Sequence, residues 1–265
     1  MTFAWSTVGT VTVNGVRLGF REAGDRAGAP VLLLHGSGSN ARTWDRFAAR
    51  LTGAGRRAIA VDLRGHGTSA RPGHYSLASI RDDVLALLDK LSLRGAVLVG
   101  HSVGGYAALA AAQHSPEQVG GLVLEDLAAP PRQSSPMNGF DPLQVLAAAA
   151  GIFTARRDYQ LRAVGSILRQ LTRPDADWWT RLDEVRQPTL ILSGGPASCI
   201  PPGRLADVAS VIPGARLTTI PVGHRVHSLA PDQFAAEVLG FLAKAARPAR
   251  PHVACFRHAE VRVQT

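Results

Sequence analysis

A serine lies between two glycines where two apolar stretches meet. The motif Gly-His-Ser-Val-Gly (100–104) follows the β-rich run 96–99 and precedes an alanine-rich stretch that ends at Ala112. This order predicts a buried strand that turns at once into a helix and pushes the Ser102 hydroxyl into a cleft. The N–H groups at the start of that helix can stabilise a developing oxyanion. We interpret Ser102 as a nucleophile, and a simple helix cap is the alternative.

A serine hydroxyl needs a base, because it is a poor nucleophile at neutral pH. His224 lies in the stretch GHRVH (223–227), after the last predicted strand and before the last predicted helix. Loops at the carboxyl ends of parallel strands meet at one rim, so this imidazole can reach Ser102. His227 is the second choice, with a surface or supporting role expected for it. His101 is carried away by the turn, and we expect a packing or hydrogen-bonding role for it.

The oxyanion of an acyl transfer also needs donors. The stretch HGSGSN (35–40) follows the first predicted parallel strand, and its glycines let backbone N–H groups approach a ligand. We predict that the amides of Ser37 and Val103 are these donors. The alternative is an ordinary glycine-rich turn before a helix.

The apolar pattern predicts the elements that position these residues. The stretch 9–24 alternates apolar and polar residues around Asn14-Gly15, which is typical of an antiparallel hairpin. Continuous apolar runs at 30–34, 57–61, 96–99, 121–126, 188–194 and 215–221 alternate with helical spacing, as at 80–91. Runs that are apolar on both faces indicate a mostly parallel sheet with helices on both faces, so the predicted fold class is α/β.

The alternation stops between residues 127 and 186. A proline-rich start is followed by helical spacing over 159–171, where the apolar stripe comprises Leu161, Val164, Leu168 and Leu171, and where Arg162 and Arg169 face water. We predict a helical cap (127–186) inserted into a core formed by residues 1–126 and 187–246. Residues 247–265 form a basic tail, expected to be poorly ordered.

Together these motifs resemble the α/β-hydrolase superfamily, in the branch with a helical cap between strands six and seven. The resemblance covers residues 8 to 245 and depends on LLLHGSGSN, DLRGHGTS, VGHSVGG, GLVLED and VGHRVHSLAPDQF. It implies the chain order serine, acid, histidine for the catalytic residues. It also implies that Asp62, Arg64, Gly65 and His66 shape a wall after strand four.

One position departs from that resemblance. Many relatives place the acid after strand seven, where this chain has Ala197 in GGPASCIPP. Asp126, at the end of strand six, is the replacement that some relatives use, haloalkane dehalogenases among them. Glu125 competes with it, because a shift of one residue reverses the direction of a strand side chain. The remaining alternative is a serine–histidine dyad without an acid, in which Asp126 only caps the entry to the helical cap.

The resemblance implies a serine hydrolase that cleaves a carboxylic ester or lactone of a small to medium apolar substrate through an acyl-serine. C–C bond hydrolases, thioesterases and perhydrolases would use the same residues, and a non-catalytic ligand-binding homologue is an alternative of another class. Five aromatic residues are candidates for the walls of a pocket, although such residues more often pack in the core than contact a ligand: Trp44, Phe140, Phe153, Trp178 and Trp179.

The net charge of +9 does not indicate a nucleic-acid partner. The tail 247–265 carries four arginines and one glutamate, and most other arginines are scattered. No metal or phosphate-binding motif occurs, so we expect no cofactor. The start does not resemble a secretory signal, no long apolar run occurs, and the chain has only two cysteines, so we expect a cytoplasmic protein without a membrane partner. We also expect a monomer or homodimer that acts on a small molecule.

Overall fold

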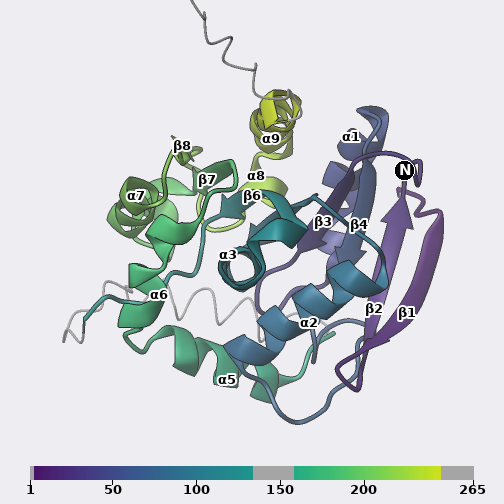
Figure 1. Cartoon of the computed structure of the whole chain (residues 1–265), viewed down its shortest axis with the longest axis horizontal. Coiled ribbons are helices and arrows are strands. Elements are labelled where there is room, and N and C mark those ends of the chain that lie inside the picture. The colour runs from purple at the N-terminus through teal and green to yellow at the C-terminus, as the bar shows by residue number, and fades with distance from the viewer. Residues whose placement is uncertain (1–2, 134–157, 246–265) are drawn as a thin grey trace, which may run out of the picture.

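The computed structural model describes residues 3–133 and 158–245, and its strands form a single sheet of eight. The strands are β1 (Thr7–Val13), β2 (Val16–Ala23), β3 (Pro30–Leu34), β4 (Arg57–Val61), β5 (Ala96–His101), β6 (Val119–Glu125), β7 (Thr189–Ser193) and β8 (Arg216–Thr219). Their order across the sheet is β1-β2-β4-β3-β5-β6-β7-β8 (Figure 1). Strands β1, β2 and β4 pair antiparallel, and the remaining neighbours pair parallel. The predicted hairpin turns at Asn14-Gly15, and both residues have positive φ angles.

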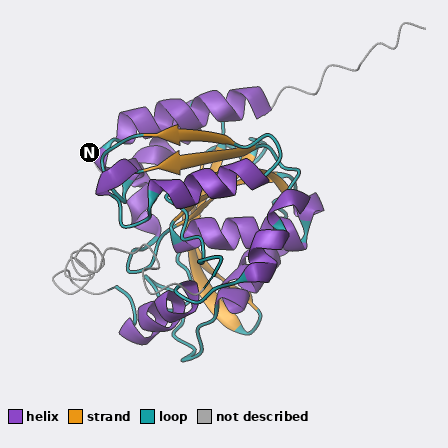
Figure 2. Cartoon of the chain, turned by 90° about the vertical axis from the view of Figure 1, so that its left-hand side faces the viewer, coloured by secondary structure: helices purple, strands orange, loops and turns teal. Residues whose placement is uncertain are grey.

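Helices cover both faces of this sheet (Figure 2). The described helices are α1 (Asp45–Gly53), α2 (Leu77–Lys90), α3 (Val103–His114), α5 (Leu161–Leu171), α6 (Ala176–Thr180), α7 (Pro202–Val211), α8 (Val226–Leu229) and α9 (Pro231–Ala245), with short 3-10 helices η1 (Ala41–Trp44), η2 (Pro116–Gln118), η3 (Leu182–Glu184) and η4 (Gly195–Ala197). Among these helices, none is both long and apolar enough to cross a bilayer.

Successive residues of each strand enter two different cores, because strand side chains alternate between the faces. Leu32 and Leu34 pack with side chains of α2, α3 and α7 on one face. Val31 and Leu33 pack with side chains of α1 and α9 on the other. Both faces are buried, which explains the continuous apolar runs and confirms the predicted fold class.

The helix predicted near residue 161 forms, but its buried face differs from the prediction. The prediction placed four side chains on that face: Leu161, Val164, Leu168 and Leu171. Val164 and Leu171 are buried as predicted, but Leu161 and Leu168 are 39% and 42% exposed, and Ala163 and Ile167 are buried in their place. Ala163 packs against Gly65, where an added Cβ would come within 2.8 Å of the alanine methyl group. A small residue therefore fits that contact, and the helix is rotated accordingly; Arg162 and Arg169 are exposed, as predicted.

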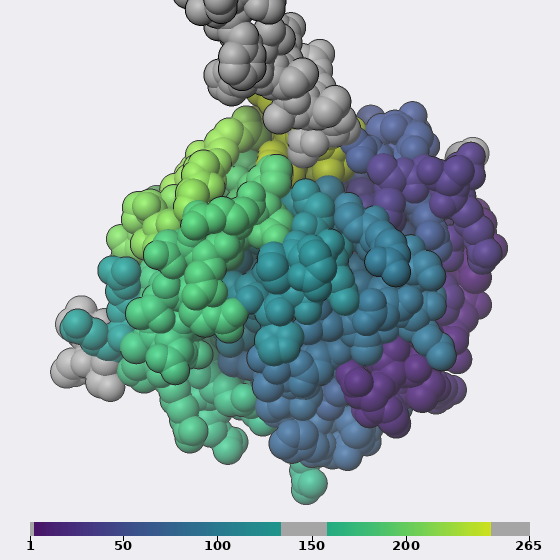
Figure 3. Space-filling view, in the orientation of Figure 1, coloured from purple at the N-terminus to yellow at the C-terminus, as the bar shows by residue number. Residues whose placement is uncertain are grey.

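Helices α5 and α6 lie between β6 and β7 in the chain, and their green surface adjoins the blue and teal surface of α2 and α3 (Figure 3). The Trp178 ring stacks on the Tyr106 ring of α3 at 6.0 Å between centroids, and the Gln113 side chain donates to the Trp178 carbonyl. Residues 134–157, with the candidate wall residues Phe140 and Phe153, lie outside the described residues, as does the tail 247–265.

Candidate active site

Ser102 occupies the turn between β5 and α3, and its backbone has φ 53° and ψ −114°. Such a positive φ is uncommon for a residue with a side chain. Strand and helix approach closely here: a Cβ on Gly100 would lie 2.3 Å from the Gly104 carbonyl oxygen, and one on Gly104 would lie 2.2 Å from that of Leu34. Both glycines are therefore needed for the turn to form. The Ser102 amide donates to the Glu125 carbonyl at 2.9 Å, which joins the turn to β6.

Asp126 and His224 form a direct hydrogen bond at the adjacent strand end. The His224 Nδ1 lies 2.6 Å from Asp126 Oδ2. Asp126 is fully buried and also accepts from the Gly194 amide at 2.8 Å and from the Ser198 hydroxyl. Because the ionised carboxylate only accepts, Nδ1 carries the hydrogen and Nε2 is left as the basic nitrogen.

Glu125 pairs with His227, three residues after His224 and at the start of α8 (Val226–Leu229). Its carboxylate accepts from the His227 Nδ1–H at 2.7 Å and from the His227 amide at 2.9 Å. Asp126 has a positive φ of 45°, so the chain leaves the strand direction there and the two carboxylates diverge. The structure thus places Asp126, and not Glu125, on His224.

The environment of His224 favours its protonated form. Burial by itself lowers the pKa of this imidazole, but the hydrogen bond to Asp126 and the Cys199 side chain outweigh it and raise the pKa to about 10. The side chain of His224 keeps 26% of its surface exposed, whereas that of Asp126 has none. A carboxylate without solvent stabilises an adjacent imidazolium strongly.

Two residues after β7 take part in the site that the sequence did not indicate. Ala197, at the position where many relatives carry the acid, ends the short helix η4. The next residue, Ser198, donates its hydroxyl to Asp126, and the thiol of Cys199 lies within hydrogen-bonding reach of His224. The loop after β7, which carries the acid in many relatives, here donates hydrogen bonds to Asp126 at the end of β6. The available sequence signal was Ser198, which directly follows Ala197 at the position where many relatives have an aspartate.

His101 is buried and joins two loops. Its Nε2 donates to the His224 carbonyl at 2.8 Å, and the two rings lie 4.6 Å apart. Burial, followed by the neighbouring histidines, holds the pKa of His101 well below its ordinary value, so the ring is neutral. A carbonyl can only accept, which assigns the hydrogen to Nε2. This is the hydrogen-bonding role that the sequence predicted.

The loop 35–40 lies directly against the serine turn. A Cβ on Gly36 would come 2.5 Å from His101 Nδ1 and 3.3 Å from the Ser102 Cβ. The Gly38 amide donates to His66 Nε2 at 3.3 Å. Burial, followed by the nearby His35, lowers the pKa of His66 to about 3, so its ring is neutral and accepts this bond. The wall after β4 therefore braces the loop.

The two predicted oxyanion donors lie in the segments that meet at this point. Val103 is the first residue of α3, where a helical N–H has no partner inside the helix. Ser37 follows Gly36 in the loop. Its hydroxyl is buried and has no hydrogen-bond partner among the described residues.

Other residues that the sequence singled out are buried and have structural partners. Asp62 accepts from the Ala41 amide at 2.7 Å, and Arg64 holds Asp83 through two hydrogen bonds of 2.7 and 2.6 Å. Trp44, Trp178 and Trp179 are each at most 5% exposed and pack as core.

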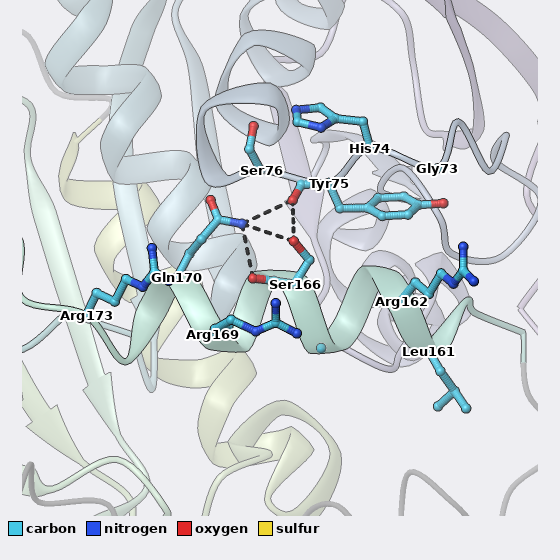
Figure 4. A pocket seen from close by; sticks show the side chains of 11 residues that line it. Gly73, His74, Tyr75, Ser76, Leu161, Arg162, Ser166, Arg169, Gln170 and Arg173 are labelled. Carbon is cyan, nitrogen blue, oxygen red and sulfur yellow. Dashed lines mark hydrogen bonds between the residues drawn. The ribbon is translucent and has the colours of Figure 1, made fainter.

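A separate pocket of about 750 Å³ opens between the loop 73–76 and α5 (Figure 4). Arg162, Arg169 and Arg173 line it, and the Ser166 and Gln170 side chains donate to the Tyr75 carbonyl at its base. Its lining contains none of the predicted site residues. The candidate site is therefore the group of Ser102, Asp126 and His224 at the carboxyl ends of the strands.

Comparisons with known proteins agree with this fold. A family model described as the alpha/beta hydrolase family matches residues 31–237. The dihydrolipoyllysine-residue acetyltransferase component of the acetoin cleaving system of Pseudomonas putida is 32% identical over 257 residues, which span 88% of this chain and 68% of that protein. The sn-1-specific diacylglycerol lipase ABHD11 of Mus musculus is 29% identical over 256 residues, with 83% of each chain covered. The structure of a thermophilic esterase from Thermogutta terrifontis superposes with a TM-score of 0.72 at 26% identity, covering 91% of this chain and 99% of the esterase. The chain belongs to the alpha/beta hydrolase family, and it is a hydrolase of that fold.

Proposed function

We propose that the protein is a serine hydrolase that cleaves a carboxylic ester or lactone of a small to medium apolar substrate through an acyl-serine intermediate. The observation that carries this proposal is the 2.6 Å hydrogen bond between His224 and the buried Asp126, one strand away from a serine held in a strained turn. This pair supplies a base of fixed tautomer beside a candidate nucleophile.

The reaction follows from the roles of these groups. His224 Nε2 takes the Ser102 proton as Oγ attacks the substrate carbonyl, while the Ser37 and Val103 amides donate to the resulting oxyanion. The imidazolium then gives its proton to the leaving alkoxide, and the acyl group stays on Ser102. Water, deprotonated by the same nitrogen, attacks the acyl-serine, releases the carboxylic acid and returns the proton to Oγ.

The raised pKa of His224 has a part in this scheme. Asp126 stabilises the imidazolium that forms during acylation, so it lowers the barrier to proton transfer from Ser102. The same stabilisation keeps the resting imidazole protonated at low pH. Activity therefore increases as the pH rises through the pKa of His224, because only the neutral ring accepts a proton.

Similarity to a diacylglycerol lipase and to an esterase supports ester bonds as the substrate class. C–C bond hydrolysis, thioester hydrolysis and perhydrolysis would use the same residues. A non-catalytic ligand-binding homologue would not need the His224–Asp126 hydrogen bond.

A panel of p-nitrophenyl esters and lactones with acyl chains of increasing length tests the proposal. We expect turnover by the wild-type chain and stoichiometric labelling of Ser102 by a fluorophosphonate. Ser102→Ala should lose both. Ser115→Ala, at the opposite end of α3, is the matched control and should retain them. Turnover of Ser102→Ala near the wild-type rate would refute the assignment.

A further inference from the structure

A second buried acid–histidine–hydroxyl series lies beside the proposed catalytic one. Glu125 accepts from the His227 ring at 2.7 Å, and the opposite ring nitrogen, Nε2, lies 2.7 Å from the Thr43 hydroxyl. A carboxylate oxygen accepts from a ring N–H, so Nδ1 of His227 donates to Glu125, and Nε2 is the ring nitrogen that meets the Thr43 hydroxyl. The proposed mechanism uses none of these three side chains.

Glu125 and His227 are closed off from solvent, mostly by aromatic rings, while Thr43 is half-buried. Glu125 has no exposed surface and His227 has 4%. The Trp44 ring lies against the His227 ring at 4.4 Å between centroids, and the Phe234 ring meets it edge-on at 6.1 Å. Hydrogen bonds in such an environment are stronger than in water, and losing one partner leaves a buried polar group unsatisfied.

The series joins the segments that carry the proposed catalytic groups. Thr43 belongs to η1, which directly follows the loop 35–40 and begins at its cap Asn40. His227 belongs to α8, three residues after His224. Glu125 precedes Asp126, and its carbonyl accepts from the Ser102 amide. Hydrogen bonds thus connect three segments: η1, which follows the loop 35–40 (the oxyanion loop), the segment that contains His224, and strand β6, which ends just before Asp126.

We propose that Glu125, His227 and Thr43 act as positioning residues that hold the His224 loop and the oxyanion loop at their catalytic spacing. This inference rests on the proposed function. His101 supplies a second link between the same loops, because its ring lies on Gly36 and its Nε2 donates to the His224 carbonyl. The carboxylate of Glu125 fixes both the backbone and the ring of His227, which determines where the preceding turn places His224.

A purely structural hydrogen bond would affect stability without a selective effect on turnover. A positioning role predicts a different result, because a shift of about 1 Å in reacting groups costs roughly 100-fold in rate. Substrate binding does not require that alignment. The expected signature is therefore a decrease in kcat with KM almost unchanged.

Thr43→Val and Glu125→Gln test this with little change in shape. We expect each to lower kcat at least about tenfold, with KM within about twofold, and we expect Thr43→Ser to restore most of the loss. Two matched controls should leave kcat unchanged: Thr218→Val, at a half-buried position of the edge strand β8, and Glu22→Gln, which alters a buried glutamate paired with Arg57. If Glu125→Gln fails to fold, the milder Thr43→Val decides.

A readout that does not need turnover separates this inference from the proposed function. The Nδ1–H proton of His224 gives a low-field NMR signal that reports its hydrogen bond to Asp126. We expect Glu125→Gln and Thr43→Val to shift or broaden this signal and the two controls to leave it in place. An unchanged signal, or a kcat within twofold of wild type in both variants, would overturn the inference. A wild-type chain without turnover or fluorophosphonate labelling would refute the proposed function, while the NMR result would still decide whether the series positions His224.

Discussion

Replacing Asp126 by asparagine removes the negative charge beside His224 with almost no change in volume. Raising the pKa of His224 from 6.5 to about 10 corresponds to roughly 5 kcal/mol of stabilisation of the imidazolium. Burial lowers this pKa while Asp126 and Cys199 both raise it, so the net value is not the contribution of the carboxylate alone. An asparagine can also donate to the ring and so favour the wrong tautomer. We expect kcat to fall by about 10²- to 10⁴-fold.

The pH profile gives the same substitution a second test. In the wild type, kcat/KM should increase with pH, with a midpoint above the ordinary imidazole pKa of 6.5 and toward 10. Without the carboxylate, burial remains and lowers the pKa of His224, so the midpoint should move to lower pH. Stopped-flow or plate assays with an aryl ester between pH 5 and 10.5, on folded protein verified by circular dichroism, measure both effects. A variant with the wild-type kcat and an unmoved midpoint would refute the role of Asp126.

Three further changes test the fold around the site. Ile167→Ala should lower the free energy of unfolding by about 2–4 kcal/mol, because Ile167 is buried. Leu168→Ala, one position along α5, should change it by less than about 1 kcal/mol, because Leu168 is exposed. Equal losses of stability in urea denaturation would contradict the observed rotation of the helix. Asp83→Asn should cost about 3 kcal/mol, because it leaves the buried Arg64 guanidinium without its carboxylate, and an unaltered unfolding midpoint would count against that view. Deletion of residues 247–265 should leave ester turnover unchanged, because the motifs end before them, and lost turnover would show that the tail takes part in the site.

The sequence was sufficient for the sheet and for the turn at Ser102, because both depend on local patterns. Strands buried on both faces need continuous apolar runs, and the approach of α3 to β5 needs the glycines at 100 and 104. These requirements appear directly as residue types at fixed spacing. The hairpin at Asn14-Gly15 follows the same logic, since both residues adopt positive φ.

The partners of the two carboxylates could not be assigned from the sequence. Glu125 and Asp126 are adjacent, and each finds a histidine in the stretch 223–227, so residue types alone fit either pairing. The backbone decides, because the positive φ of Asp126 turns the chain out of the strand. The contribution of Ser198 is equally hidden, since it depends on how the loop after β7 folds back over β6.

The rotation of α5 has a comparable cause. The expected stripe followed the helical spacing of apolar residues and so included Leu161 and Leu168. The helix instead buries the small Ala163, because the contact with Gly65 leaves room for a methyl group only. Tertiary contacts of this kind outweigh the hydrophobic pattern of an isolated helix.

The most direct test of the account is the rate and site of fluorophosphonate labelling, followed by mass spectrometry across pH. The account predicts a single adduct on Ser102, a rate that increases as His224 loses its proton, and a decrease of at least about 100-fold in His224→Gln. An adduct on another residue, or a Ser102 labelling rate that does not depend on His224, would contradict it.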